Sequence, residues 1–151
     1  STGPEPSTVR SMEISDAIGF LSERHHAVIV TLSEGEVPHA TNVVYAFDGT
    51  TFRVSVTDGR VKTDNLRRRP LAAMHVASDD FWSYVAATCD VELSPVSTEP
   101  GDATGQELMT VFEAVQGKPH PDPEEFMQAM VDDRRLVVRL TPTAVHGQLP
   151  R

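Results

Sequence analysis

The chain has 151 residues, which is the usual size of one domain and is enough to bury a sizeable core. Its 22 acidic residues outnumber its 13 basic ones, and the net charge of -9 argues against general binding to nucleic acids or anionic membranes, because both attract extended basic surfaces. The single cysteine, Cys89, cannot form an internal disulfide, and we find neither a signal-peptide pattern nor an apolar run long enough to cross a membrane. We therefore expect one cytoplasmic domain that binds no nucleic acid and no membrane.

The first segment in chain order is polar and rich in proline, and we expect residues 1–10 to form a flexible tail ahead of a domain at 11–151. Apolar residues then recur at positions i, i+3, i+4 and i+7 from Ile14 to Leu21. This spacing predicts an amphipathic helix that ends near His25.

Segments typical of strands follow, joined by short turns such as Asp48-Gly49. Two helices come next, and the second has a clear start, with Asp122 as its N-cap and Pro123 at its first position. The predicted strands are 27–33, 39–47, 51–57, 71–78, 82–94 and, after the predicted helices 103–116 and 123–132, 135–142. Short turns without long intervening helices predict a mainly β, α+β fold, a six-stranded antiparallel meander or barrel with peripheral helices.

One stretch is strongly basic in this acidic protein. Residues 57–70 read TDGRVKTDNLRRRP. If the chain is extended there, Arg60 and Lys62 project to the same side, and a short helix over 64–69 would turn its N-terminal amides toward the same point. With the hydroxyl of Thr63, these groups predict a phosphate clamp. The arginines at 67–69 either extend this clamp or form only a solvated helix face.

Several common active-site patterns are missing from the sequence, including the Gly-rich dinucleotide fingerprint, the phosphate loop, His-Glu-x-x-His and paired cysteines. The six histidines have no spacing that would gather metal ligands, so we predict no metal site. Cys89 lies among apolar strand residues, and we interpret it as a packed small hydrophobe and not as a nucleophile.

The run SVTDGRVKTDNLRRRPLAAMHV, followed by WSYVAATCDVEL, resembles the split β-barrel of the pyridoxamine 5'-phosphate oxidase-like flavoproteins, from about Ile14 to Gly147. The Arg-x-Lys-Thr form at 60–63, with TNVVYAFD before it and FWSY after it, resembles the actinobacterial branch that uses the deazaflavin coenzyme F420. The family's Arg-bearing C-terminal substrate-phosphate segment is missing, so we do not expect oxidation of pyridoxamine phosphate.

The resemblance implies a homodimer with the cofactor site at its interface. The segment Arg60, Val61, Lys62 and Thr63 would hold the coenzyme phosphate, and Arg67 would accept the glutamate tail. The ring edge would be lined by Thr41, Asn42, Val43, Ser55 and Val56, while Trp82, Ser83 and Tyr84 would reach the site from the partner chain. Trp82 and Tyr84 could instead serve dimer packing without touching the ligand.

The expected function is that of an F420-dependent oxidoreductase, which transfers hydride from the reduced deazaflavin to a small conjugated organic substrate. The alternatives are an FMN-dependent reductase or oxidase of the same fold, and a non-catalytic deazaflavin- or haem-binding protein. No catalytic residue is assigned, since Tyr45, Tyr84 or solvent could each supply a proton. The two helices near 103–132 could shape a substrate pocket.

Overall fold

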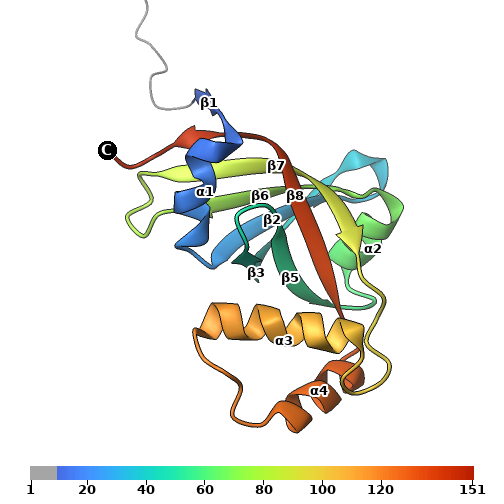
Figure 1. The fold of residues 1–151 in the computed structure, drawn as a ribbon. Coiled ribbons are helices and arrows are strands. Elements are labelled where there is room, and N and C mark those ends of the chain that lie inside the picture. The colour runs from blue at the N-terminus through green and yellow to red at the C-terminus, as the bar shows by residue number, and fades with distance from the viewer. Residues whose placement is uncertain (1–9) are drawn as a thin grey trace, which may run out of the picture.

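The structure is a computed structural model that describes residues 10–151, so the predicted tail at 1–10 lies outside the described residues except for Arg10. A strongly curled antiparallel sheet forms most of the molecule (Figure 1). The strands are β1 Arg10–Met12, β2 His26–Leu32, β3 Pro38–Val44, β4 Ala46–Phe47, β5 Phe52–Thr57, β6 Leu71–Ala77, β7 Tyr84–Leu93 and β8 Arg135–Gln148. Their order is β3-β2-β6-β7-β8-β5-β4, and β1 pairs with β8.

The helices surround this sheet. They are α1 Ile14–Ser22, α2 Val61–Arg68, α3 Ala103–Gln116 and α4 Pro123–Asp132, with a short 3-10 helix at Glu34–Glu36. The predicted capping of α4 is confirmed, because the side chain of Asp122 accepts a hydrogen bond from the backbone N–H of Glu125 at 3.1 Å. In Figure 1, α3 and α4 form a separate layer beneath the barrel, and α2 lies on its flank.

The mainly β fold with peripheral helices is confirmed, but the strand count of six is not, since the sheet has eight strands. One additional strand, β4, arises because the predicted strand 39–47 breaks at Tyr45. There the backbone N–H donates to the carbonyl of His25 at 2.8 Å, and the buried hydroxyl donates to the carbonyl of Leu21 at 2.7 Å. The chain thus leaves β2 at Tyr45 and continues toward β5.

The last strand is longer than predicted, because it does not stop at Pro142. Proline lacks a backbone N–H and usually interrupts a central strand. Here the pairing of β7 with β8 shifts register between Thr88 and Cys89, and Pro142 lies opposite Cys89 at this irregularity. At this bulge the ladder is already irregular, so the missing N–H of Pro142 does not end the strand. The strand β8 therefore continues to Gln148 and also pairs with β1.

The barrel is open along one seam. Among the described strands β3 pairs only with β2, while β5 pairs with β8 along its length and with β4 only at Phe52 and Arg53. The facing edges of β3 and β5 therefore keep backbone groups without strand partners. Inside the barrel, apolar side chains such as Ile29, Phe52 and Met74 are fully buried. Within residues 10–151 we find no helix that is both long and apolar enough to span a membrane.

Candidate functional site

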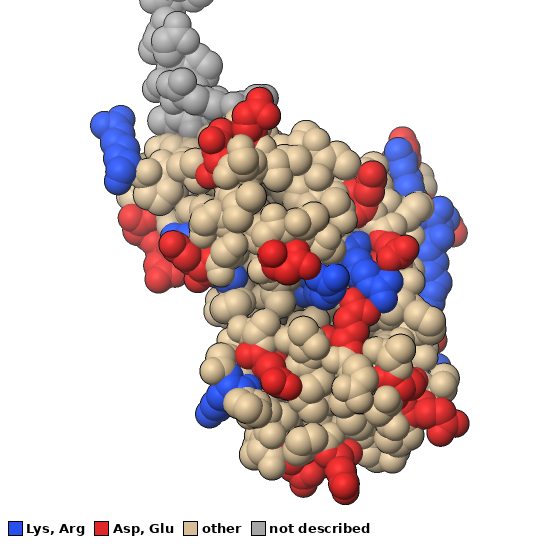
Figure 2. All heavy atoms as spheres, viewed as in Figure 1, with Lys and Arg blue, Asp and Glu red and all other residues tan. Residues whose placement is uncertain are grey.

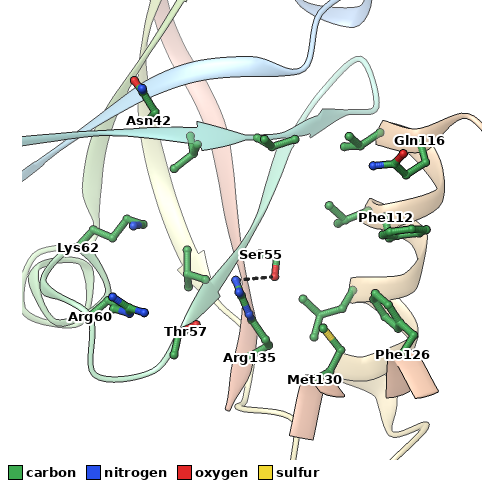
Figure 3. Close-up of a pocket in the computed structure, with 16 residues that line it drawn as sticks. Asn42, Ser55, Thr57, Arg60, Lys62, Phe112, Gln116, Phe126, Met130 and Arg135 are labelled. Carbon is green, nitrogen blue, oxygen red and sulfur yellow. Dashed lines mark hydrogen bonds between the residues drawn. The ribbon is translucent and has the colours of Figure 1, made fainter. Parts of the chain in front are cut away.

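A cavity of about 530 Å³ lies at this seam, and we call it the seam cavity (Figure 3). Its walls come from β3, β5, the start of α2, the start of β8, and the helices α3 and α4. The lining residues are Asn42, Val43, Val44, Ser55, Val56, Thr57, Arg60, Lys62, Leu108, Val111, Phe112, Val115, Gln116, Phe126, Met130 and Arg135. Its volume falls within the range of small-molecule sites.

Three cationic side chains, Arg60, Lys62 and Arg135, line the seam cavity, and no acidic residue does. The Arg135 guanidinium donates to Asp133 at 3.1 Å and approaches the hydroxyl of Ser55 at 3.5 Å. The side chains of Arg60 and Lys62 have no hydrogen bond or ion pair with other residues in the described range. Burial, followed by the nearby charges of Arg60 and Arg135, holds the pKa of Lys62 below its usual value.

The prediction that Lys62 lies on extended chain, ahead of a helix at 64–69, is wrong, because α2 already begins at Val61. Arg60 is the extended N-cap residue, and Lys62 is the second residue of the first turn. Both nevertheless face the seam cavity, as Figure 3 shows. Arg60 makes no side-chain cap, so the first backbone N–H groups of α2 keep their donor capacity. Two cations at an uncapped helix N-terminus interact unfavourably with the positive end of the helix dipole. A bound anion would interact favourably with both the cations and the dipole.

The three arginines after this turn are held by the chain itself. Arg67 pairs with Asp58, and Arg69 pairs with Glu36. Arg68 donates to the carbonyl of Leu32 and to the side-chain oxygen of Asn65, each at 2.9 Å. None of the three lines the seam cavity. Arg67 therefore lies outside the seam cavity, and its predicted contact with the glutamate tail stays a prediction.

The charge distribution on the surface fits this division. Figure 2 shows acidic side chains scattered over the visible face. The basic ones gather mainly along the flank of α2 and where the barrel meets α3. The face shown carries no extended basic surface, which suits a small anion better than an extended polyanion.

Six of the predicted site residues lie together in the seam cavity: Asn42, Val43, Ser55, Val56, Arg60 and Lys62. Thr63 does not, since it is fully buried and its hydroxyl donates to the carbonyl of Thr57 at 2.9 Å. Val61 is exposed outside the lining. Thr41 also lies outside the lining, but its hydroxyl oxygen is buried and has no hydrogen-bond partner among the described residues.

Trp82, Ser83 and Tyr84 lie away from the seam cavity of their own chain. Ser83 is buried and its N–H donates to the hydroxyl of Ser78 at 3.0 Å, while Tyr84 stacks on His75 with ring centroids 5.1 Å apart. Trp82 is 77% exposed and the preceding Phe81 is 79% exposed. Whether these residues reach a partner's site stays a prediction.

A second hollow, the outer cavity, lies on the other side of β3 and has a volume of about 420 Å³. It is lined by His26, Ala27, Val28, Asn42, Val43, Val44, His75, Ala77 and Phe81. Asn42, Val43 and Val44 line both cavities. The edge strand β3 is therefore the shared wall between them.

Sequence reasoning missed Arg135 and did not identify the cavity residues of α3 and α4. Arg135 faces Lys62 because Arg135 is the register partner of Thr57, at the end of the strand that leads into α2. Only the pairing of β5 with β8 could have revealed this proximity. We predicted that the two helices could shape a pocket, but no pattern of residues supported that role. The spacing of their apolar residues indicated only that each helix has an apolar face.

Two reactive side chains are unavailable for chemistry. Burial raises the pKa of the Tyr45 hydroxyl, which already donates to the carbonyl of Leu21. Burial also raises the pKa of the Cys89 thiol to about 12. Tyr45 is therefore not a proton donor for the seam cavity, and a thiol with this pKa is a poor nucleophile at neutral pH.

Comparison with known proteins finds several similar chains, including the following three. Over 69 residues the chain is 39% identical to F420H(2)-dependent biliverdin reductase from Mycobacterium tuberculosis (strain CDC 1551 / Oshkosh), which covers 44% of this chain and 50% of that protein. The chain thus matches about half the length of this relative. A solved F420 reductase aligns with a TM-score of 0.64 and 24% identity, over 83% of this chain and 93% of the other. A solved conserved hypothetical protein from Mycobacterium tuberculosis aligns with a TM-score of 0.73 and 19% identity, over 99% and 95%.

The two solved structures support the split-barrel fold. A family model described as Pyridoxamine 5'-phosphate oxidase matches residues 17–148, which is most of the chain. This protein therefore belongs to the pyridoxamine 5'-phosphate oxidase family.

Proposed function

We propose that this protein is an F420-dependent reductase that binds the deazaflavin coenzyme in the seam cavity and reduces a small conjugated organic substrate. The observation that carries the proposal is the cluster of Arg60, Lys62 and Arg135, which has no acidic residue in its lining and adjoins an uncapped helix N-terminus. In a protein of net charge -9, such a cluster is best explained by an anionic ligand.

The residues present fit this coenzyme. Arg60, Lys62 and the first amides of α2 would hold its phosphate by charge-assisted hydrogen bonds. The open edges of β3 and β5 offer backbone donors and acceptors to the polar edge of the ring. The unpartnered hydroxyl of Thr41, on β3 beside Asn42, is a further donor that a ligand could satisfy.

When bound in its reduced form, the coenzyme supplies a hydride to an electrophilic carbon of the substrate, and the substrate takes one further proton. The protein's part is to position the two molecules and to exclude water. The apolar side chains of α3 and α4 serve the second purpose. Within one chain solvent supplies the proton, since Tyr45 is committed to the carbonyl of Leu21 and Tyr84 of the same chain lies outside the seam cavity.

The coenzyme choice follows from charge. FMN has a single phosphate, whereas F420 adds a tail with several carboxylates. Arg135 adds a third cation beyond the Arg60 and Lys62 pair, which suits a ligand with more than one anionic group. The relative that shares 39% identity over 69 residues is named for F420 and not for a flavin.

The protein acts as a homodimer in this proposal. Phe81 and Trp82 project from the loop between β6 and β7, which is fixed by hydrogen bonds between Ser78 and Ser83 and by a positive φ of 70° at Phe81. No acidic, lysine or arginine side chain lines the adjacent outer cavity, so two copies of an acidic protein could meet there without strong repulsion. A partner on this face would reach the edge of β3, where the two cavities adjoin.

Equilibrium titration of the purified protein tests the proposal, with oxidised F420 and FMN in parallel in the same buffer. We expect tighter binding of F420, and an affinity that falls as salt increases, because several contacts are ionic. Oxidation of the reduced coenzyme in the presence of a panel of conjugated acceptors then tests turnover. Equal or tighter FMN binding would refute the coenzyme assignment, and binding without turnover across the panel would favour a carrier of the coenzyme.

A further inference from the structure

The two halves of the seam cavity differ in chemistry. The half formed by β5, α2 and β8 contains the three cations together with Ser55 and Thr57. The opposite half, which we call the apolar wall, consists of Leu108, Val111, Phe112, Val115, Phe126 and Met130 from α3 and α4. Gln116 is the one polar side chain that these helices add to the described lining. Figure 3 shows the two halves facing each other across the cavity.

We infer that the apolar wall binds the substrate and that Phe112 determines its specificity for molecules whose reacting part is flat, conjugated and uncharged. The inference rests on the proposed function. The ring of the coenzyme has hydrogen-bonding groups along one edge, and the open edges of β3 and β5 lie on the cationic side. A ring placed there turns one flat face toward α3 and α4, and a second flat molecule fits between that face and the apolar wall.

The apolar wall presents surface that a charged group would not tolerate. Leu108, Val111 and Phe126 are buried, and no acidic or basic side chain stands among them in the lining. A carboxylate pressed against this surface would lose its hydration without gaining a partner. An aromatic substrate, by contrast, would gain apolar burial and contact with the ring of Phe112.

Phe112 has a defined position because it belongs to an aromatic cluster. Its ring centroid lies 5.4 Å from that of Phe126 and 4.8 Å from that of His120, and the last two are 5.3 Å apart. The cluster joins α3, the loop after it and α4. Phe112 thus reaches the seam cavity on a packed support and not as a mobile surface side chain.

The helix that carries Phe112 is also fixed to the sheet. Glu107, five residues earlier on α3, accepts hydrogen bonds from Arg53 at 3.0 Å and from Arg139 at 2.8 and 2.6 Å. These two arginines lie on β5 and β8, so the carboxylate ties α3 to both strands. The distance between the apolar wall and the strand edges is therefore set by structure within this chain.

The test measures binding of two matched probes to the protein saturated with oxidised coenzyme. Naphthylmethanol is flat and uncharged, and naphthoate has the same rings with a carboxylate. We expect naphthylmethanol to bind more tightly than naphthoate. Phe112→Leu should weaken the binding of naphthylmethanol by about two- to twelve-fold. The coenzyme dissociation constant should stay within about two-fold of the parent, because Phe112 lies opposite the cationic half.

A second variant guards against a loss caused by poor folding. Val115→Lys adds a cation to the apolar wall and should raise naphthoate affinity by up to about five-fold, a gain that misfolding cannot produce. Ala114→Lys is its control, since Ala114 precedes it on α3 but does not line the seam cavity. An equal gain in naphthoate affinity in both variants would show that the added positive charge acts wherever it stands on α3. That result would overturn the inference.

The remaining outcomes separate this inference from the proposed function. If Phe112→Leu weakens coenzyme and probe alike, the apolar wall covers the coenzyme and the inference fails. If the parent prefers naphthoate, the substrate class is wrong. If the parent does not bind the coenzyme at all, the proposed function fails, and the same probe titrations on the coenzyme-free protein decide whether the apolar wall is a binding surface.

Discussion

Replacing Lys62 with alanine tests the anion site most directly. Lys62 lines the seam cavity, has no partner within the described residues, and shares the cavity with Arg60 and Arg135. A hydrogen bond to a charged group contributes about 1.5–3 kcal/mol. Its loss should therefore weaken F420 binding by about ten- to a hundred-fold. We expect the dissociation constant from fluorescence or calorimetric titration to rise by this factor.

The same substitution should leave the stability of the ligand-free protein unchanged or higher. The folded state disfavours the charged form of Lys62, since burial and the two neighbouring arginines lower its pKa. This unfavourable contribution is therefore fully present at neutral pH, and it fades as the pH rises through the lowered pKa toward the usual value of 10.5. Truncation at neutral pH removes the repulsion and no core packing, so the melting temperature should not fall.

The matched control is Lys118→Ala, which makes the same change of net charge in the loop between α3 and α4, outside the seam-cavity lining. It should alter F420 affinity by less than about two-fold, because an exposed distant charge is screened. Parent-like binding by Lys62→Ala would refute the anion site. A much lower melting temperature would show instead that Lys62 has a structural role.

Three further predictions concern stability and assembly. Glu107→Gln should lower the free energy of unfolding at neutral pH. The hydrogen bond from Arg139 is the main cause that lowers the pKa of Glu107. The loss of unfolding free energy should therefore be largest above pH 4.5 and should shrink as the pH falls through the lowered pKa. Urea titrations at several pH values would detect this dependence. Tyr45→Phe should cost about 1–3 kcal/mol in urea unfolding, because the buried carbonyl of Leu21 loses its donor; an unchanged midpoint would contradict this reading. Trp82→Ala should raise the dimer dissociation constant by about thirty-fold or more if this exposed ring is an interface anchor, and light scattering that finds the parent itself monomeric at micromolar concentration would count against the dimer.

Local patterns were enough for several elements of this protein. The i, i+3, i+4 and i+7 spacing located α1, and the Asp122-Pro123 signal located the start of α4. The cationic turn at Arg60 and Lys62 also followed from sequence, although their convergence depends on the first turn of α2 and not on extended chain. Each of these features involves residues within about one or two helical turns, where backbone geometry alone limits the arrangement.

The features that only the tertiary structure decided are those set by the pairing of distant segments. Arg135 joins the cation cluster through the register of β5 with β8, whereas Arg67 pairs with Asp58 outside the seam cavity. The strand β8 passes Pro142 because a bulge in β8 itself, with Thr143 as the extra residue, lies beside the proline. The apolar wall faces the strand edges because Glu107 ties α3 to β5 and β8. A sequence shows which side chains are available for such contacts, but sheet register and helix docking depend on packing of the whole chain, and these determine which side chains share a cavity.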